Sequence, residues 1–72
     1  MTDSDALRKK IEDMGLKLKY VAYQLGISAY SLQKKINNVT EFKSGEIIRL
    51  CKILNIVSLE EREKIFFRTE GD

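Results

Sequence analysis

The chain has 72 residues, a net charge of +2 and 33% charged residues. This length fits one small domain, and we expect a single domain over residues 1–72 with an ordered core from about residue 5 to residue 67. The single cysteine, Cys51, and the lack of histidine exclude a disulfide framework and a zinc site. A catalytic thiol would need a base, and no Gly-rich phosphate loop is present. We therefore expect no enzyme, no cofactor and no small-molecule substrate.

The apolar segments are short and interrupted by charges, and residues 1–3 do not begin a secretion signal. Together with the lone thiol, this favours an intracellular, reducing location without a membrane partner. Proline is absent, and no segment alternates apolar and polar residues as a strand would. The composition therefore predicts an all-α domain.

The charge is segregated along the chain. Residues 17–40 contain four lysines (Lys17, Lys19, Lys34, Lys35) and no acidic residue, whereas residues 41–72 contain seven acidic and six basic residues. A local basic patch is typical of a phosphate-binding surface. The competing interpretation is that these lysines are only solvated side chains on short helices.

A first helix is predicted over residues 5–14, because Leu7, Ile11 and Met14 fall on one apolar stripe. Gly15 has the residue type that ends helices in the left-handed conformation. The chain then continues into the segment that carries the clearest structural signals.

Residues 18–25 and 29–37 are predicted to form two short helices joined by a tight turn, which is the sequence form of a helix-turn-helix. Small Ala22 allows the two helices to cross closely. Gly26 can take the positive φ that ends the first helix, and Ser28 supplies an N-cap oxygen for the second. The apolar residues expected to face the core are Val21, Leu25, Ile27, Leu32 and Ile36.

The spacing leaves polar and aromatic side chains on the outer face of this helix pair. Gln33 has the paired donor and acceptor that match adenine, Lys34 can reach guanine acceptors or a phosphate, and Tyr30 can pack on a thymine methyl. Asn37 and Asn38 are suited to phosphate contacts. The candidate DNA- or partner-binding residues are Lys17, Lys19, Tyr20, Tyr23, Ala29, Tyr30, Gln33, Lys34, Asn37 and Asn38.

The tyrosines leave two interpretations open. Tyr20 and Tyr23 can cover neighbouring apolar groups while their hydroxyls stay in water. They can equally be contact residues, because tyrosine is enriched in protein interfaces. Arginine, the commonest reader of guanine, is missing from both helices of the pair.

The rest of the chain is predicted to add two helices. Val39 and Phe42 are expected to tuck under a connector, and residues 44–54 carry the next apolar stripe. A capping box from Ser58 to Glu61 begins the last helix. The apolar residues of these two helices are Ile47, Leu50, Cys51, Leu54, Leu59, Ile65 and Phe66.

The run from Ile65 to Phe67 is too continuous for one narrow apolar stripe. One of its aromatic rings is expected to seal the core, and a second, if exposed, would be available for contact in a homodimer. The small size of the domain favours core positions for both rings.

The string LKLKYVAYQLGISAYSLQKKINN (residues 16–38) resembles the Cro/C1-type helix-turn-helix family, which has the lambda-repressor-like fold. The family's Ala, Gly and inner apolar positions correspond to Ala22, Gly26, Ile27 and Leu32. The resemblance covers nearly the whole chain and implies five helices, with the second and third forming the DNA-binding motif. The family often opens the second helix with Ser-Gln, where this chain has Lys17 and Leu18, and often has an apolar residue where this chain has Lys35.

The later string EFKSGEIIRLCKILNI (residues 41–56) is similar to short regulators of temperate phages of Gram-positive bacteria. This resemblance implies a role at the lysis–lysogeny switch, in the cytoplasm of the bacterial host. One hypothesis is a Cro-like regulator, dimeric, that reads operator DNA with residues 29–37. The other is an antirepressor resembling the modulator of repression, which would bind the phage repressor protein through the face that carries the tyrosines.

Overall fold

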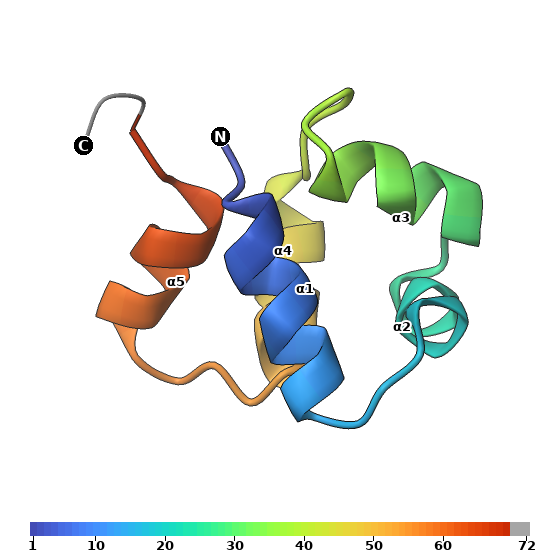
Figure 1. Ribbon diagram of the computed structural model, residues 1–72, viewed down its shortest axis with the longest axis horizontal. Coiled ribbons are helices and arrows are strands. Elements are labelled where there is room, and N and C mark those ends of the chain that lie inside the picture. Colours follow the sequence, from blue (N-terminus) through green and yellow to red (C-terminus); the bar gives the residue numbers. More distant parts are fainter. Residues whose placement is uncertain (70–72) are drawn as a thin grey trace.

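The computed structural model describes residues 1–69, and within them all regular structure is helical (Figure 1). The helices are α1 (Ser4–Asp13), α2 (Leu18–Leu25), α3 (Ala29–Ile36), α4 (Ser44–Ile53) and α5 (Leu59–Phe66). The predicted all-α fold of five helices is confirmed. Helix α2 has the predicted bounds, whereas α3 and α4 each end one residue early because Asn37 and Leu54 are their C-cap residues.

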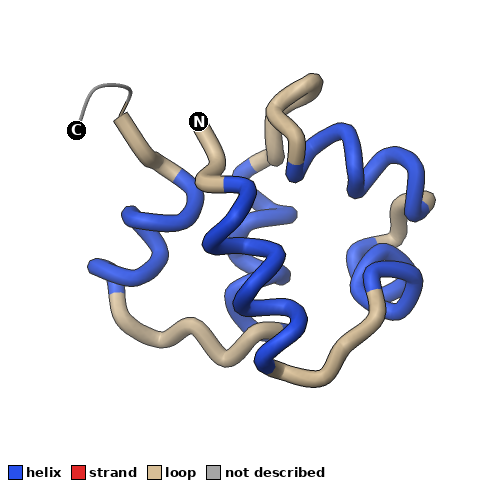
Figure 2. The backbone as a smooth tube through the Cα atoms, in the orientation of Figure 1, coloured by secondary structure: helices blue, strands red, loops and turns tan. Residues whose placement is uncertain are grey.

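Helices α1 and α4 form the middle of the molecule as seen in Figure 1, with α5 on one side and the α2–α3 pair on the other. Helix α2 packs against α3 and α4, and α1 packs against α3 and α5. Figure 2 shows that the loop after α3 arches above the helices before the chain enters α4. The helix-turn-helix therefore stands at one side of the domain, where α1 and α4 support it.

Local signals define the helix-turn-helix as predicted. Gly26 ends α2 with a φ of 75°. The Ser28 hydroxyl accepts a hydrogen bond from the Ser31 N–H at 3.0 Å and so caps α3. Ala22 is buried at the crossing of the two helices. A larger side chain at this position would force the helices apart.

One core unites the five helices. The fully buried side chains are Leu7, Val21, Leu32, Ile36, Leu50 and Leu54. Phe66, the last residue of α5, closes the core, and its ring meets the Phe42 ring edge to face with centroids 5.6 Å apart. The core roles predicted for Phe42 and Phe66 are therefore confirmed.

Four apolar residues differ from their predicted burial. Val39 is 68% exposed and Leu59 is 61% exposed, because Val39 lies in the loop that leaves the core and Leu59 in the first turn of α5. Phe67 is 51% exposed, so the expectation that both rings are buried is wrong. Met14, which was predicted to share the apolar stripe of Leu7 and Ile11, is 40% exposed at the C-cap of α1. The core also includes Ile56, which lies in the link between α4 and α5 and for which no core position was predicted.

A buried ion pair joins α3 to α4. The Lys35 Nζ lies 3.1 Å from the Glu46 Oε1, and the two side chains are only 9% and 16% exposed. Lys35 also donates to the Glu41 carbonyl, and the same Glu46 oxygen accepts from the Lys43 N–H at 2.8 Å. Burial acts to raise the pKa of Glu46, but the hydrogen bonds from Lys43 and Lys35 outweigh it and hold that pKa below its ordinary value.

The segment before α1 also joins the packed unit, although we expected the ordered core to begin at about residue 5. Thr2 is buried, and the Asp3 N–H donates to the Ile65 carbonyl of α5 at 2.7 Å. The Asp3 carboxylate caps α1 by accepting from the Ala6 N–H.

Candidate nucleic-acid interface

Helix α3 has two distinct faces. Leu32, Lys35 and Ile36 are buried against the domain, whereas Tyr30 and Gln33 on the opposite side are exposed. This division follows from the helical repeat, since residues three and four positions apart lie on the same face. The exposed face is therefore a rigid row of side chains on a helix whose other side is fixed in the core.

Lys34 and Tyr30 form a pair on this face. The Lys34 Nζ lies 5.3 Å from the centre of the Tyr30 ring, within the range of a cation–π contact. The two residues are four positions apart, so the helix itself brings them together. The contact favours one orientation of the ammonium group while leaving it at the surface.

The small residue at the start of α3 completes the row. Ala29 is half-buried, with Tyr30 one position further along the helix. At the other end of α3, Asn37 is exposed and serves as the C-cap residue. The predicted residues of α3 therefore lie along one strip of surface.

Helix α2 contributes basic and aromatic side chains. Lys17 occupies its N-cap position with an extended backbone and makes no side-chain cap, and both Lys17 and Lys19 are exposed. Tyr23 is 79% exposed, and Tyr20 is about half exposed. These side chains surround an open, mainly apolar hollow of about 460 Å³, whose lining residues are Gly15, Leu16, Lys17, Lys19, Tyr20 and Tyr23.

An arginine from α1 reaches the end of α3, which the sequence analysis missed. The Arg8 Nη2 donates a hydrogen bond to the Asn37 Oδ1 at 2.7 Å. Arg8 lies one helical turn from Ser4, whose hydroxyl donates to the Ile36 carbonyl. The i, i+4 spacing of Ser4 and Arg8 was visible in the sequence, but which element this face of α1 meets was not. The candidate surface therefore includes an arginine, although α2 and α3 contain none.

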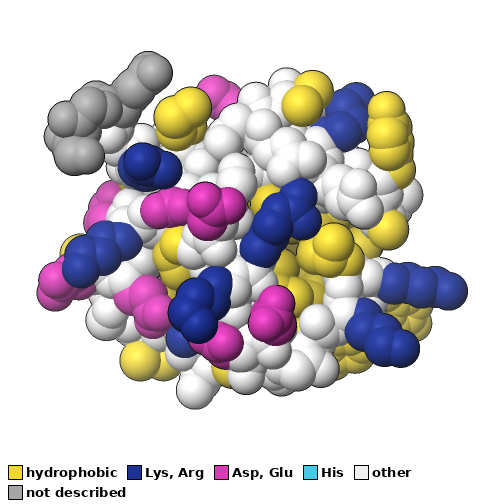
Figure 3. All heavy atoms as spheres, in the orientation of Figure 1, with side chains coloured by type: hydrophobic (Ala, Val, Ile, Leu, Met, Phe, Trp, Pro, Cys, Tyr) yellow, Lys and Arg dark blue, Asp and Glu magenta, His cyan; other side chains and the backbone are white. Residues whose placement is uncertain are grey.

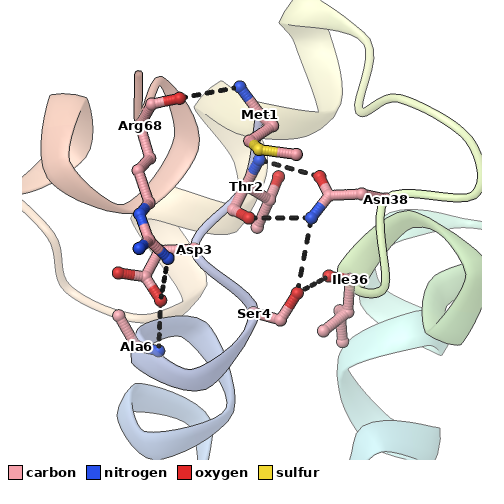
Figure 4. A network of polar contacts seen from close by, with 8 residues as sticks. All are labelled: Met1, Thr2, Asp3, Ser4, Ala6, Ile36, Asn38 and Arg68. Carbon is pink, nitrogen blue, oxygen red and sulfur yellow. Dashed lines mark hydrogen bonds and ion pairs between the residues drawn. The ribbon is translucent and has the colours of Figure 1, made fainter. Parts of the chain in front are cut away.

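Lys35 and Asn38 are placed differently from the other predicted polar residues. Lys35, which we counted in the basic patch, is buried and neutralised by Glu46. The Asn38 side chain is hydrogen-bonded to the backbone of Thr2, as Figure 4 shows. The exposed positive charges of this region are therefore Arg8, Lys17 and Lys19, with Lys34 half-buried beside Tyr30.

The distribution of charge separates this region from the rest of the molecule. In the face shown in Figure 3, acidic side chains gather over α1 and α5, and none lies over α2 and α3. Some of the acidic groups over α1 and α5 pair with neighbouring cations, as Glu61 does with Lys10 and Glu60 with Lys64. Polyanions should therefore approach the helix-turn-helix side in preference to the α5 side.

The described residues contain little that points to another chemistry. In residues 1–69, no three His, Cys, Asp or Glu side chains are grouped so that they could hold a metal ion. Burial raises the pKa of the Cys51 thiol, so it is a poor nucleophile. No helix in this part of the chain has the length and apolar character needed to cross a bilayer.

Comparison with known proteins agrees with the geometry. Residues 6–61 match the family model described as a Cro/C1-type HTH DNA-binding domain. No curated protein and no solved structure matches the chain significantly. The matched range runs from within α1 through α4 to the start of α5 and includes the whole helix-turn-helix. This chain belongs to the Cro/C1-type helix-turn-helix family of DNA-binding domains.

Proposed function

We propose that this protein is a transcription regulator that binds operator DNA by placing the exposed face of α3 in the major groove. The observation that carries the proposal is this face itself: Tyr30 and Gln33 point away from a core that fixes Leu32 and Ile36. Because a helix fits the width of the major groove, its outer side chains can reach base edges there. The family assignment supports the same use of the motif.

The two kinds of DNA contact are divided among the residues by chemistry. Gln33 offers an amide that can bond both the N6 and N7 positions of adenine, and Tyr30 and Ala29 offer apolar surface to a thymine methyl. Lys17, Lys19 and Arg8 lie around α3 and are suited to phosphates. Lys34 is suited to a guanine or a phosphate. Asn37 extends the surface at the end of the helix.

Substitutions on α3 should weaken DNA binding in two different ways. Lys34→Ala should lower the affinity and reduce the salt dependence by about one counterion, because one positive charge is lost from the interface. Gln33→Ala should cost about 1–3 kcal/mol on the operator and little on unrelated DNA, since it removes a base contact. Titration of the promoter region beside the gene and of an unrelated duplex, each at several salt concentrations, measures both effects.

The matched control is Lys64→Ala. This lysine is exposed on α5, outside the proposed interface, and pairs with Glu60 at 3.7 Å. Its removal should leave the affinity within the error of the measurement. Equal losses for Lys34→Ala and Lys64→Ala would mean that only net charge matters, which contradicts a defined interface.

We further propose that the regulated genes belong to the lysis–lysogeny switch of a temperate phage of a Gram-positive host. The resemblance of residues 41–56 to short phage regulators supports this role. A divergently transcribed repressor gene beside this one would be consistent with it. A gene neighbourhood without phage genes would contradict it.

A second candidate function is antirepression through direct binding of the phage repressor. The specific observation is the apolar hollow that the exposed rings of Tyr20 and Tyr23 line. Lys17 and Lys19 border the same hollow. Such aromatic surface is typical of protein contacts. In this proposal the α2–α3 face holds a protein, and altered DNA occupancy follows from that complex.

Co-elution tests the second function. The protein and the repressor of the same phage should elute together in size-exclusion chromatography at micromolar concentration, and Tyr30→Ala should abolish the complex. Leu59→Ala, an exposed apolar residue on α5, serves as the control that should not affect it. Separate elution of the two proteins counts against antirepression.

We also propose a homodimer in which half-exposed Phe67 is a contact residue. Light scattering on the protein alone measures its molar mass and so tests this proposal.

A further inference from the structure

The segment from Met1 to Ser4 runs between α5 and the turn that follows α3. On one side it is bound to α5 and to the residue after its C-cap: Asp3 N–H donates to the Ile65 carbonyl at 2.7 Å, and Arg68 N–H donates to the Met1 carbonyl at 2.9 Å. Figure 4 shows this segment between the two elements. Two of its anchors therefore lie in α5 and directly after it, away from α3.

On its other side the same segment holds the end of α3. The Thr2 N–H donates to the Asn38 Oδ1 at 2.9 Å, and the Asn38 Nδ2 donates back to the Thr2 carbonyl at 2.9 Å. The Ser4 hydroxyl donates to the Ile36 carbonyl, one of the last carbonyls of α3. The Asn38 amide thus bonds both the N–H and the C=O of Thr2, as the backbone of a facing residue does in an antiparallel sheet (Figure 4).

The backbone of Asn38 makes this pairing specific. Asn38 has a φ of 64°, the left-handed conformation that Asn adopts more readily than most residues with a side chain. This conformation follows the C-cap of α3 and directs the side chain toward Thr2, which is buried. Both the oxygen and the nitrogen of the amide are used inside the protein, which is a different role from the phosphate contact expected from the sequence.

We propose that residues 1–4 form a brace that fixes the C-terminal end of α3 for DNA binding, with Asn38 as the positioning residue. The inference rests on the proposed function of α3. Helix α3 has eight residues, so the orientation of its second half depends on how its end is held. Loss of the brace should loosen residues 37–40 and lower DNA affinity, even though the brace residues do not touch DNA.

Amide hydrogen exchange of the free protein tests the brace without DNA. Asn38→Gly keeps the positive φ accessible and removes the two side-chain bonds to Thr2 and the weaker bond to the Ser4 hydroxyl at 3.4 Å, so exchange at residues 37–40 should become roughly tenfold faster. Ser4→Ala removes the bonds of the Ser4 hydroxyl to Ile36 and Asn38 by a change on α1 and should produce the same local effect. Amides of α2 should keep their wild-type rates in both variants. The proposal would be overturned by faster exchange throughout the chain, or by an unchanged exchange rate at residues 37–40.

The matched control is Asn55→Gly. Asn55 also has a positive φ, 55°, but it lies after α4. This variant introduces the same backbone freedom away from α3 and should leave exchange at residues 37–40 unchanged. If Asn55→Gly accelerates exchange at residues 37–40 equally, the effect comes from the added glycine, and this result would contradict the brace.

Titration with a mixed-sequence DNA duplex at low salt separates positioning from contact. Asn38→Gly and Ser4→Ala should each weaken binding roughly fivefold or more, and the double variant should be no weaker than the weaker single variant, because both disable one device. Weaker binding in Asn38→Gly alone, with Ser4→Ala at the wild-type value, would identify Asn38 as a direct phosphate contact and overturn the proposal. If the wild-type protein binds no duplex, the DNA function fails, and the exchange rates alone decide whether the brace exists.

Discussion

Glu46→Ala should leave the protein largely unfolded at 25 °C and neutral pH. The substitution removes the carboxylate partner of Lys35, whose side chain is 9% exposed, and leaves its charge without a counter-ion between α3 and α4, held by its hydrogen bond to the Glu41 carbonyl. Breaking a buried ion pair in this way costs about 3–5 kcal/mol. A domain of this size has on the order of 3–5 kcal/mol of net stability, so the loss is comparable to the whole. Urea unfolding followed by circular dichroism measures it.

Lys35→Met is the informative control for this prediction. It removes the charge together with its desolvation cost, and methionine fills a similar volume, so stability should stay the same or increase. Glu46 then retains its hydrogen bond from the Lys43 N–H. If Lys35→Met destabilises the protein as much as Glu46→Ala, the attraction within the pair, and not the stranded charge, dominates.

The same pair predicts how stability depends on acid. Because the folded pKa of Glu46 lies below its ordinary value of 4.5, its stabilising contribution is complete above that pH. As the pH falls below 4.5, the unfolded chain takes up the proton first, and the contribution is lost as the pH passes through the folded pKa. The difference in unfolding free energy between the wild type and Glu46→Gln should therefore shrink over this range. A difference that grows with acid would contradict the lowered pKa.

Leu32→Ala should mainly reduce stability and Tyr30→Ala should mainly reduce binding, because these residues occupy opposite faces of α3. Leu32 is fully buried, and its truncation should cost about 2–5 kcal/mol of stability through lost contacts and a cavity. Tyr30 is exposed, so its truncation should change stability by less than about 0.5 kcal/mol while weakening the binding of DNA or the repressor. Thermal unfolding and a binding titration of each variant measure the two effects.

For Leu32→Ala, a loss of binding caused by unfolding must be distinguished from a loss caused by a damaged binding face. The variant should regain most of its binding at a temperature low enough to keep it folded, since its outer face is intact. If Tyr30→Ala unfolds the protein, or if Leu32→Ala abolishes binding while folded, the assignment of the two faces is wrong.

The parts of the fold that local chemistry controls were predictable. Gly26 and Ser28 lie on either side of Ile27 in the turn, and each acts on the backbone near it, so the end of α2 and the cap of α3 could be inferred from the sequence. The spacing of Leu32 and Ile36 likewise identified the inner face of α3. These features need no knowledge of distant residues.

Features that depend on contacts between elements were not predictable. Lys35 was expected to join a basic patch, because nothing near it in the sequence shows that the first turn of α4 brings Glu46 to it. Arg8 was not assigned to the site, because its meeting with Asn37 depends on how α1 crosses α3. Asn38 carries the residue type of a phosphate contact, yet its amide pairs with Thr2, which lies 36 positions away in the sequence. Val39 and Leu59 are as apolar as core residues, and only the path of the loop after α3 and the orientation of the first turn of α5 place them at the surface.

The central claim, that α3 presents its outer face to DNA, is tested most directly by nuclear magnetic resonance. Promoter DNA is titrated into the ¹⁵N-labelled protein, and the shift of each backbone amide is followed. The proposed function predicts that the largest shifts occur at residues 29–37 and at Arg8, Lys17 and Lys19. Shifts confined to α4 and α5, around Ile48 and Phe67, with residues 29–37 unaffected, would contradict it.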